Sequence, residues 1–471
     1  MTRRLSIHAV RGAALCAAAA AAAACGGGGK RAPDPPKPPE VDAEGPHRDA
    51  VAAAIRPYLD AELISGLVVG LYDAGRREIY GFGKGPGGAA PDGGSLFELG
   101  TLTRVYTGLL LADAIQRREV ELGAQVAEYL PPGVTVPTRD KVAITLRHLA
   151  LHSSGLPPLP PSIARAPADD PFRGYDKDAL YRDLARTQLA YVPGASIQPS
   201  SFATGLLGFA IGRKLGTGYT KAIEARILRP LELHDTTFVV PAAAAARQLA
   251  GTDDDLAAAP RWAWNALAGA GGLISSARDQ LRLIEAELDA AAGGKTLPLR
   301  NPMRLTQEPQ LDPTSTENAG LGWMIDGDGR LWHGGGSAGF RAFVIFDPKT
   351  KRGVVALAST ASPLVDRLGR ALLGLMSEDA PRPWVAPTAA QISSYAGKYD
   401  FGGTKLAMVA AGKRLYLEAP DEPRVRLLPV SDHEFWIEPL QAVAIFQQEG
   451  DKIARVVFGV GARQVAAPRI E

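Results

Sequence analysis

A threonine and an arginine stand one helical turn apart at the start of a long apolar stretch of the chain. The hydroxyl of Thr101 can act as a nucleophile only if a neighbouring group takes its proton. Arg104 is not such a group, because a guanidinium has a pKa of roughly 12 to 14 and no lone pair to offer. An imidazole titrates near neutrality, so His333, which Gly334 and Gly335 follow, is one alternative base. The other reading is that His333 orders a strand edge and contacts a ligand.

The surrounding segments predict the elements that hold these residues. The apolar run 67–72 predicts a buried strand, and 78–82 predicts its hairpin partner. The stretch 102–115 has no polar stripe, which predicts a helix buried on most sides. Further helices are predicted at 145–151, 206–215 and 364–376, and adjacent strands at 342–346 and 353–358 with a turn at 347–350. Helices interspersed with a late antiparallel sheet indicate a mixed α/β fold.

The pattern changes after residue 376. Residues 377–388 contain three prolines and predict a linker between domains. Beyond it, short alternating strands without helices predict a small antiparallel barrel or sandwich over 389–471. The strands are predicted at 406–409, 415–417, 425–428, 434–437, 443–447 and 453–458.

The segment 97–104, Phe-Glu-Leu-Gly-Thr-Leu-Thr-Arg, resembles the nucleophile motif of the serine β-lactamase and penicillin-binding-protein-like superfamily. The class C β-lactamases and the related esterases and D-aminopeptidases are the members that it resembles most. The resemblance continues in the same order through residues 147–157, 193–194, 206–208, 269–276 and 333–340. It implies a β-lactamase/transpeptidase-like domain over 49–376, with an antiparallel sheet flanked by helices. The C-terminal strands resemble the lipocalin-like barrel that is often appended to this family.

The family mechanism uses a serine and a lysine in S-x-x-K and a tyrosine in Y-x-N. In this sequence the resemblance assigns the serine position to Thr101 and the lysine position to Arg104. The tyrosine and asparagine positions fall on Pro199 and Ser201. The third motif keeps a form common in the family, His333-x-Gly335, and by the same resemblance Gly335 and Ser337 are expected to contact substrate. No serine in the chain is followed three residues later by a lysine, and no tyrosine stands two before an asparagine, so no shifted register restores the motifs.

These substitutions predict a catalytically impaired or inactive homologue. Thr101 keeps a hydroxyl, but Arg104 and Pro199 remove both proton acceptors, and general-base assistance is worth about two to four orders of magnitude in rate. The cleft is then expected to bind a small molecule, a peptide, a cell-wall fragment or a protein partner, with Arg104 favouring an anionic group such as a carboxylate.

Two alternatives remain open at this point. In one, the protein is a slow esterase, amidase or β-lactamase that uses Thr101 with help from His333. In the other, the hydrolase body is a scaffold and the C-terminal barrel binds the ligand, an idea that a polar, filled barrel would weaken. We interpret His148 and His152 as structural residues of the block 147–157.

The N-terminus indicates export. Arg3, Arg4 and Arg11 precede a short alanine-rich run, which predicts a signal peptide over 1–25 rather than a membrane span. The ending Ala-Ala-Ala-Cys resembles a lipobox and predicts lipidation of Cys25, with ordinary cleavage beside an incidental Cys25 as the alternative. The proline-rich residues 26–48 predict a tether. By resemblance to lipoprotein sorting rules, Gly26 rather than an aspartate after Cys25 predicts that the anchored protein lies on the periplasmic face of the outer membrane.

Composition excludes several classes of function. The cysteines are Cys16 and Cys25, both in the leader, so the mature body has no disulfide, no thiol nucleophile and no cysteine metal site. The chain carries 52 basic and 50 acidic residues, a net charge of +2, which gives no sign of a nucleic-acid surface. We expect no metal and no cofactor.

Overall fold

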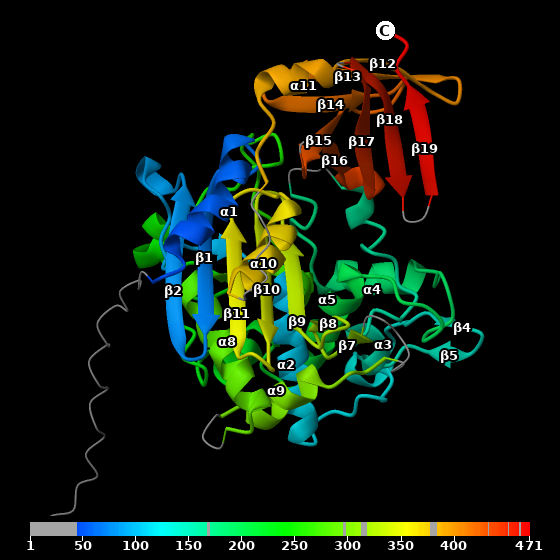
Figure 1. The fold of residues 1–471 in the computed structure, drawn as a ribbon. Helices are drawn as coiled ribbons and strands as arrows, with labels where there is room; N and C mark the ends of the chain where they lie inside the picture. The colour runs from blue at the N-terminus through cyan, green and yellow to red at the C-terminus, as the bar shows by residue number, and fades with distance from the viewer. Residues whose placement is uncertain are drawn as a thin grey trace, which may run out of the picture. The chain divides into compact units, whose positions relative to one another are not determined.

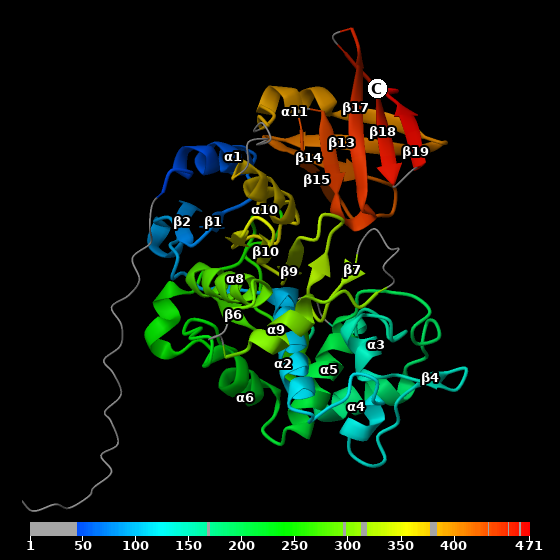
Figure 2. The ribbon, with the colours of Figure 1, turned by 60° about the horizontal axis from the view of Figure 1, so that its bottom comes forward.

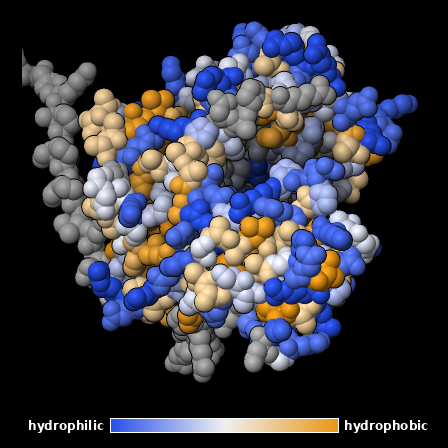
Figure 3. Space-filling view, turned by 90° about the horizontal axis from the view of Figure 1, so that it is seen from above, coloured by the Kyte–Doolittle hydropathy of each residue, from blue (hydrophilic) through white to orange (hydrophobic). Residues whose placement is uncertain are grey.

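The computed structural model describes residues 45–166, 170–294, 298–311, 318–376, 384–431, 433–450, 452–460 and 463–471. The predicted signal peptide 1–25 with Cys25, most of the tether 26–48 and residues 377–383 of the linker lie outside these ranges. In the part of the chain that is described, no helix is both long and apolar enough to cross a membrane. On the face shown in Figure 3, hydrophilic and hydrophobic residues are interspersed.

A seven-stranded antiparallel sheet forms the centre of the larger part of the protein (Figure 1). Its strands lie in the order β2-β1-β11-β10-β9-β8-β7. Their bounds are β1 Gly66–Asp73, β2 Arg76–Gly83, β7 Asn318–Ala319, β8 Met324–Ile325, β9 Leu331–Gly336, β10 Arg341–Asp347 and β11 Arg352–Ala358. The first hairpin and the pair β10–β11 confirm two predictions from the sequence. The two-residue strands β7 and β8 were not predicted, because two residues show no alternation.

Helices cover both faces of this sheet. Along β1, Val68 belongs to the core that contains Leu281 of α8 (Ala277–Ala291). The next residue, Val69, belongs to the core that contains Leu368 of α10 (Leu364–Leu375) and Ile55 of α1 (Arg48–Asp60). Because successive strand residues point to opposite faces, both faces of the sheet are buried. This explains why the strand reads as a continuous apolar run rather than an alternating one.

The helix α2 (Thr103–Gln116) lies among other helices, as its lack of a polar stripe predicted (Figure 2). Its residues from Val105 to Ala114 are buried, and Gly108 lies so close to the Leu321 carbonyl that a Cβ there would be 2.0 Å from the oxygen. Thr107 donates a hydrogen bond to the carbonyl oxygen of Gly269 at 2.7 Å. Buried side-chain contacts of this kind fix both the axial position and the rotation of α2. The other helices of this part are α3 Leu146–Ala150, α4 Lys177–Arg186, α5 Ser201–Lys214, α6 Tyr219–Ile223, α7 Ala268–Gly271 and α9 Arg300–Gln307.

The C-terminal strands form a nearly closed eight-stranded antiparallel barrel, which confirms the predicted fold of this part. A bridge between Tyr399 and Arg469 brings the first strand to the last. Its strands are β12 Gly397–Phe401, β13 Thr404–Ala411, β14 Arg414–Glu418, β15 Val425–Pro429, β16 Glu434–Ile437, β17 Ala442–Glu449, β18 Lys452–Val460 and β19 Arg463–Pro468.

The expectation that this part contains no helix was wrong, because α11 (Ala389–Tyr395) precedes the first strand. Thr388 caps this helix in a capping box with Gln391, and its apolar residues Ile392 and Tyr395 enter the barrel core. A seven-residue helix shows too few turns for a clear apolar period.

Candidate active site

The turn that carries Thr101 is fixed by a close approach of two backbones. Residues Gly100–Leu102 form a 3₁₀ turn that runs directly into α2. Gly100 has a φ of +50°, and a Cβ there would lie 2.2 Å from the carbonyl oxygen of Gly336. Only glycine meets both conditions without strain. The partly exposed Thr101 side chain is therefore held against the end of β9.

The hydroxyl of Thr101 donates a hydrogen bond to the carbonyl oxygen of Gly334 at 3.3 Å. A peptide carbonyl accepts a hydrogen bond but is not a base at neutral pH. Among the hydrogen bonds of the described residues, Thr101 makes none to a carboxylate, an amine or an imidazole. The hydroxyl is thus positioned by the backbone and makes no hydrogen bond, among the described residues, to a group that could remove its proton.

Arg104 lies one turn further along α2, where its guanidinium enters the interior. Its Nη2 donates to the Oγ of Ser201 at 3.0 Å, and its Nε is buried without a partner among the described residues. Burial lowers the pKa of Arg104 to about 10, so the side chain is still charged at neutral pH. It cannot take a proton from Thr101 in this state.

The start of α5 lies across from Arg104. Ser200 caps this helix by accepting from the Ala203 amide at 3.0 Å, and its hydroxyl donates to the Pro157 carbonyl at 2.6 Å. These two bonds fix Ser201 as the first helical residue and leave Pro199 exposed beside the cleft. Pro199 has no group that could exchange a proton.

His333 lies on β9 and is 8% exposed. Burial, reinforced by the positive charge of Arg104, lowers the pKa of His333 to about 3. Relative to an ordinary histidine of pKa 6.5, this loses on the order of 5 kcal/mol of proton-accepting free energy. Its Nδ1 is buried without a hydrogen-bond partner among the described residues. His333 is therefore a neutral ring at pH 7 and a poor base.

Gly335 and Ser337 lie beside the Thr101 turn. A Cβ on Gly335 would be 2.1 Å from the Leu99 carbonyl oxygen, so this glycine lets β9 pack against the turn. Ser337 is 7% exposed, and its hydroxyl lies beside the carboxylate of Glu98. Their contact with a substrate stays a prediction.

The interpretation of the two histidines of block 147–157 holds for His148 but is incomplete for His152. His148 is part of a capping box with Thr145, which gives it a structural role. His152, at a φ of +55°, turns its ring into the cleft, where Nε2 lies 3.5 Å from Nη1 of Arg104. Burial lowers the pKa of His152 well below its usual value, and the charge of Arg104 lowers it further. No feature of the sequence indicated this, because only the fold brings the loop after α3 to the start of α2.

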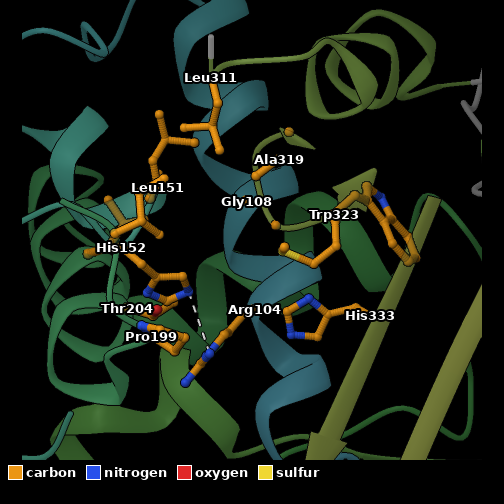
Figure 4. Close-up of a pocket in the computed structure, with 16 residues that line it drawn as sticks. Arg104, Gly108, Leu151, His152, Pro199, Thr204, Leu311, Ala319, Trp323 and His333 are labelled. Carbon is orange, nitrogen blue, oxygen red and sulfur yellow. Dashed lines mark hydrogen bonds between the residues drawn. The ribbon is translucent and has the colours of Figure 1, made fainter. Parts of the chain in front are cut away.

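Arg104, His152, Pro199 and His333 line a cavity of about 90 Å³. Thr101, Ser201, Gly335 and Ser337 are not among its lining residues. Arg104 lies between His152 and His333, and Pro199 and Thr204 lie on the side of His152 (Figure 4). Leu151, Leu311 and Trp323 form apolar walls further out. Among the described residues, no group of three or more His, Cys, Asp or Glu side chains is arranged to hold a metal ion.

Comparisons with known proteins agree with this arrangement. Residues 51–375 match the family described as Beta-lactamase. The D-alanyl-D-alanine-carboxypeptidase/endopeptidase AmpH of Escherichia coli K12 is 28% identical over 317 residues, which are 64% of this chain and 80% of AmpH. A β-lactamase of Yersinia enterocolitica is 22% identical over 353 residues, 66% of this chain and 86% of that protein. Protein flp of Staphylococcus aureus MW2 is 24% identical over 285 residues, 58% of this chain and 54% of that protein.

Proposed function

The chain belongs to the Beta-lactamase family, and from this premise we propose that it is a binding protein of the cell envelope whose hydrolytic machinery is impaired. The observation that carries the proposal is the environment of the Thr101 hydroxyl. It donates to the Gly334 carbonyl, while Arg104 occupies the position of the family's lysine. Without a proton acceptor the hydroxyl stays a weak nucleophile.

The proposed ligand is a peptide or fragment of the cell wall. AmpH, whose name states that it acts as a D-alanyl-D-alanine carboxypeptidase and endopeptidase, supports this choice of ligand class. We further propose that the protein is exported and anchored through Cys25, with 26–48 as the tether, as the alanine-rich leader favours.

A labelled penicillin and a fluorophosphonate probe test the proposal directly. Intact-mass spectrometry should detect no covalent adduct on the wild-type protein after a long incubation, with AmpH as the reactive control. An adduct that disappears in Thr101→Val would reject the proposal and establish slow hydrolysis through Thr101. Valine is the matched substitution, because it keeps the β-branched shape and removes only the hydroxyl.

A second candidate function follows from a cavity of about 810 Å³ that is lined by barrel residues together with Asp254 and Asp255. Most of its lining is apolar, with side chains that include Phe401, Leu406 and Phe458, while Glu422, Arg424 and Arg426 add charge. This favours the barrel as a module for an apolar ligand. A fluorescent fatty-acid probe should bind the full chain, and Ala419→Trp, which fills the cavity, should abolish the signal. Equal binding by both proteins would exclude the barrel as the ligand site.

A further inference from the structure

The positive charge of Arg104 has no negative partner in the protein. Its guanidinium contacts a serine hydroxyl and a neutral imidazole, and no carboxylate of the described residues forms an ion pair with it. Burial alone accounts for its lowered pKa. A buried charge costs free energy unless an opposite charge or several hydrogen bonds compensate it. The Nε–H group of the same guanidinium is also buried and lacks a hydrogen-bond acceptor among the described residues.

The tautomer of His152 follows from its hydrogen bonds. The backbone amide of Ser200 donates to Nδ1 at 3.2 Å, so Nδ1 carries a lone pair. A neutral imidazole must then carry its proton on Nε2. This is the atom 3.5 Å from Nη1 of Arg104, which also carries protons. Two donors therefore face each other, and an acceptor is needed to satisfy both.

Both Arg104 and His152 line the cavity. The hydroxyl of Ser201 accepts from Nη2 of Arg104 and holds the guanidinium in place. The cavity thus presents one positive charge and hydrogen-bond donors from α2 and from the loop after α3. Two neighbouring donors with a net positive charge fit the two oxygens of a carboxylate.

The size and walls of the cavity limit what the carboxylate is attached to. A volume of about 90 Å³ compares with roughly 10–15 Å³ for a single water, so only a few non-hydrogen atoms fit. The walls beyond the charged floor are apolar and come from residues such as Leu151, Leu207 and Met324. A short alkyl group matches them.

We propose that the cleft binds a carboxylate group on a short alkyl body, with carboxylate oxygens that accept from Arg104 and from Nε2 of His152. This inference rests on the proposed function, because it assumes a cleft that binds rather than reacts. The carboxylate belongs either to a free short-chain acid or to the C-terminus of a peptide.

Ligand-observed NMR titration of the full chain distinguishes these sources. The probes are sodium propionate and D-alanyl-D-alanine. Propionamide and D-alanyl-D-alaninamide, in which a neutral amide replaces the carboxylate, are the matched controls at constant ionic strength. Binding of propionate alone supports the free acid, and tighter binding of the dipeptide supports the peptide C-terminus. Equal binding of an acid and its amide, or no binding of either acid, would overturn the proposal.

Two variants locate the site. Arg104→Met should weaken binding about tenfold or more, since hydrogen bonds to charged groups are worth about 1.5–3 kcal/mol. His152→Asn keeps an acceptor for the Ser200 amide but lacks the Nε2 proton, and should weaken binding as well. Arg56→Met, which removes a charge from an 81% exposed side chain of α1, is the control and should bind as wild type. Unchanged affinity in Arg104→Met would also overturn the proposal.

Binding and reaction are measured separately. The NMR titration reports equilibrium binding, whereas the adduct mass reports nucleophilic attack by Thr101. Carboxylate binding together with an adduct would reject the proposed function and leave the anion site standing. No carboxylate binding and no adduct would reject the anion site alone.

Discussion

The substitution Arg104→Met removes a buried guanidinium and keeps most of its apolar stem. Burial shifts the pKa of Arg104 from 12.5 to about 10, which corresponds to about 3 kcal/mol against the charged form in the folded protein. Arg104 as a whole residue is partly exposed although its Nε is buried, so water screens part of this cost and about 2 kcal/mol remains. The variant also loses the hydrogen bond to Ser201, worth about 1 kcal/mol. The net expectation is a gain of about 1 kcal/mol, or a rise in Tm of about 2 °C.

Differential scanning calorimetry of the ligand-free protein measures this effect. Arg56→Met is the control, because its exposed side chain should change stability by less than about 0.5 kcal/mol. Added propionate should raise the Tm of the wild type and leave that of Arg104→Met unchanged, since a ligand stabilises only the state that binds it. A drop of several degrees in Arg104→Met would refute the reasoning, because it would mean that the guanidinium stabilises the empty fold.

Three further predictions concern the fold around the cleft. Gly100→Ala should lower the free energy of unfolding in urea by more than about 2 kcal/mol, because it combines a positive φ with a clash against Gly336. The control Gly87→Ala, at a φ of +71° with open space around it, should lower it by only about 1–2 kcal/mol. Burial raises the pKa of Glu287 from 4.5 to about 7. At a pH between these two values, the folded protein therefore holds a proton on Glu287 that the unfolded chain has released. Stability should therefore fall by up to about 3 kcal/mol as pH rises through this window, and Glu287→Gln should remove that share of the slope in calorimetry at pH 5 and pH 8. Ser200→Ala should cost about 1 kcal/mol through loss of the α5 cap, and the same titration should show weaker propionate binding.

The parts of the fold that could be predicted from the sequence are those with a strong local pattern. The run at 67–72 is apolar because both of its faces are covered, and α2 has no polar side because other elements surround it. Several elements were missed. The strands β7 and β8 have two residues each and α11 has seven, too few to show a local period. The longer helices α1 and α8 and the strand β9 were also not predicted, although Leu281, Ile284 and Leu288 of α8 recur at helical spacing.

Only part of the candidate site could be predicted from the sequence. The motifs identified Thr101, Arg104 and His333 as positions of interest, because the residue types alone decide which of them can accept a proton. They did not identify His152, whose role depends on a left-handed turn and on a hydrogen bond from the Ser200 amide. The tautomer of a ring is a property of its surroundings, so a donor facing a donor is visible only in three dimensions.

The replacement of lysine by arginine affects the cleft in two ways that reinforce each other. Arg104 does not accept a proton itself, and its charge also lowers the pKa of His333, the remaining group that could replace the missing base. The same charge lowers the pKa of His152 and so keeps its ring neutral, with the Nε2 proton directed at the cleft. The positive charge of Arg104 opposes protonation of the two histidine rings. The same charge attracts an anion to the cleft beside them. Under the proposed function, Arg104 therefore both fails to act as a base and favours an anion in the cleft, and we expect that reversion of Thr101 alone to serine does not produce hydrolysis.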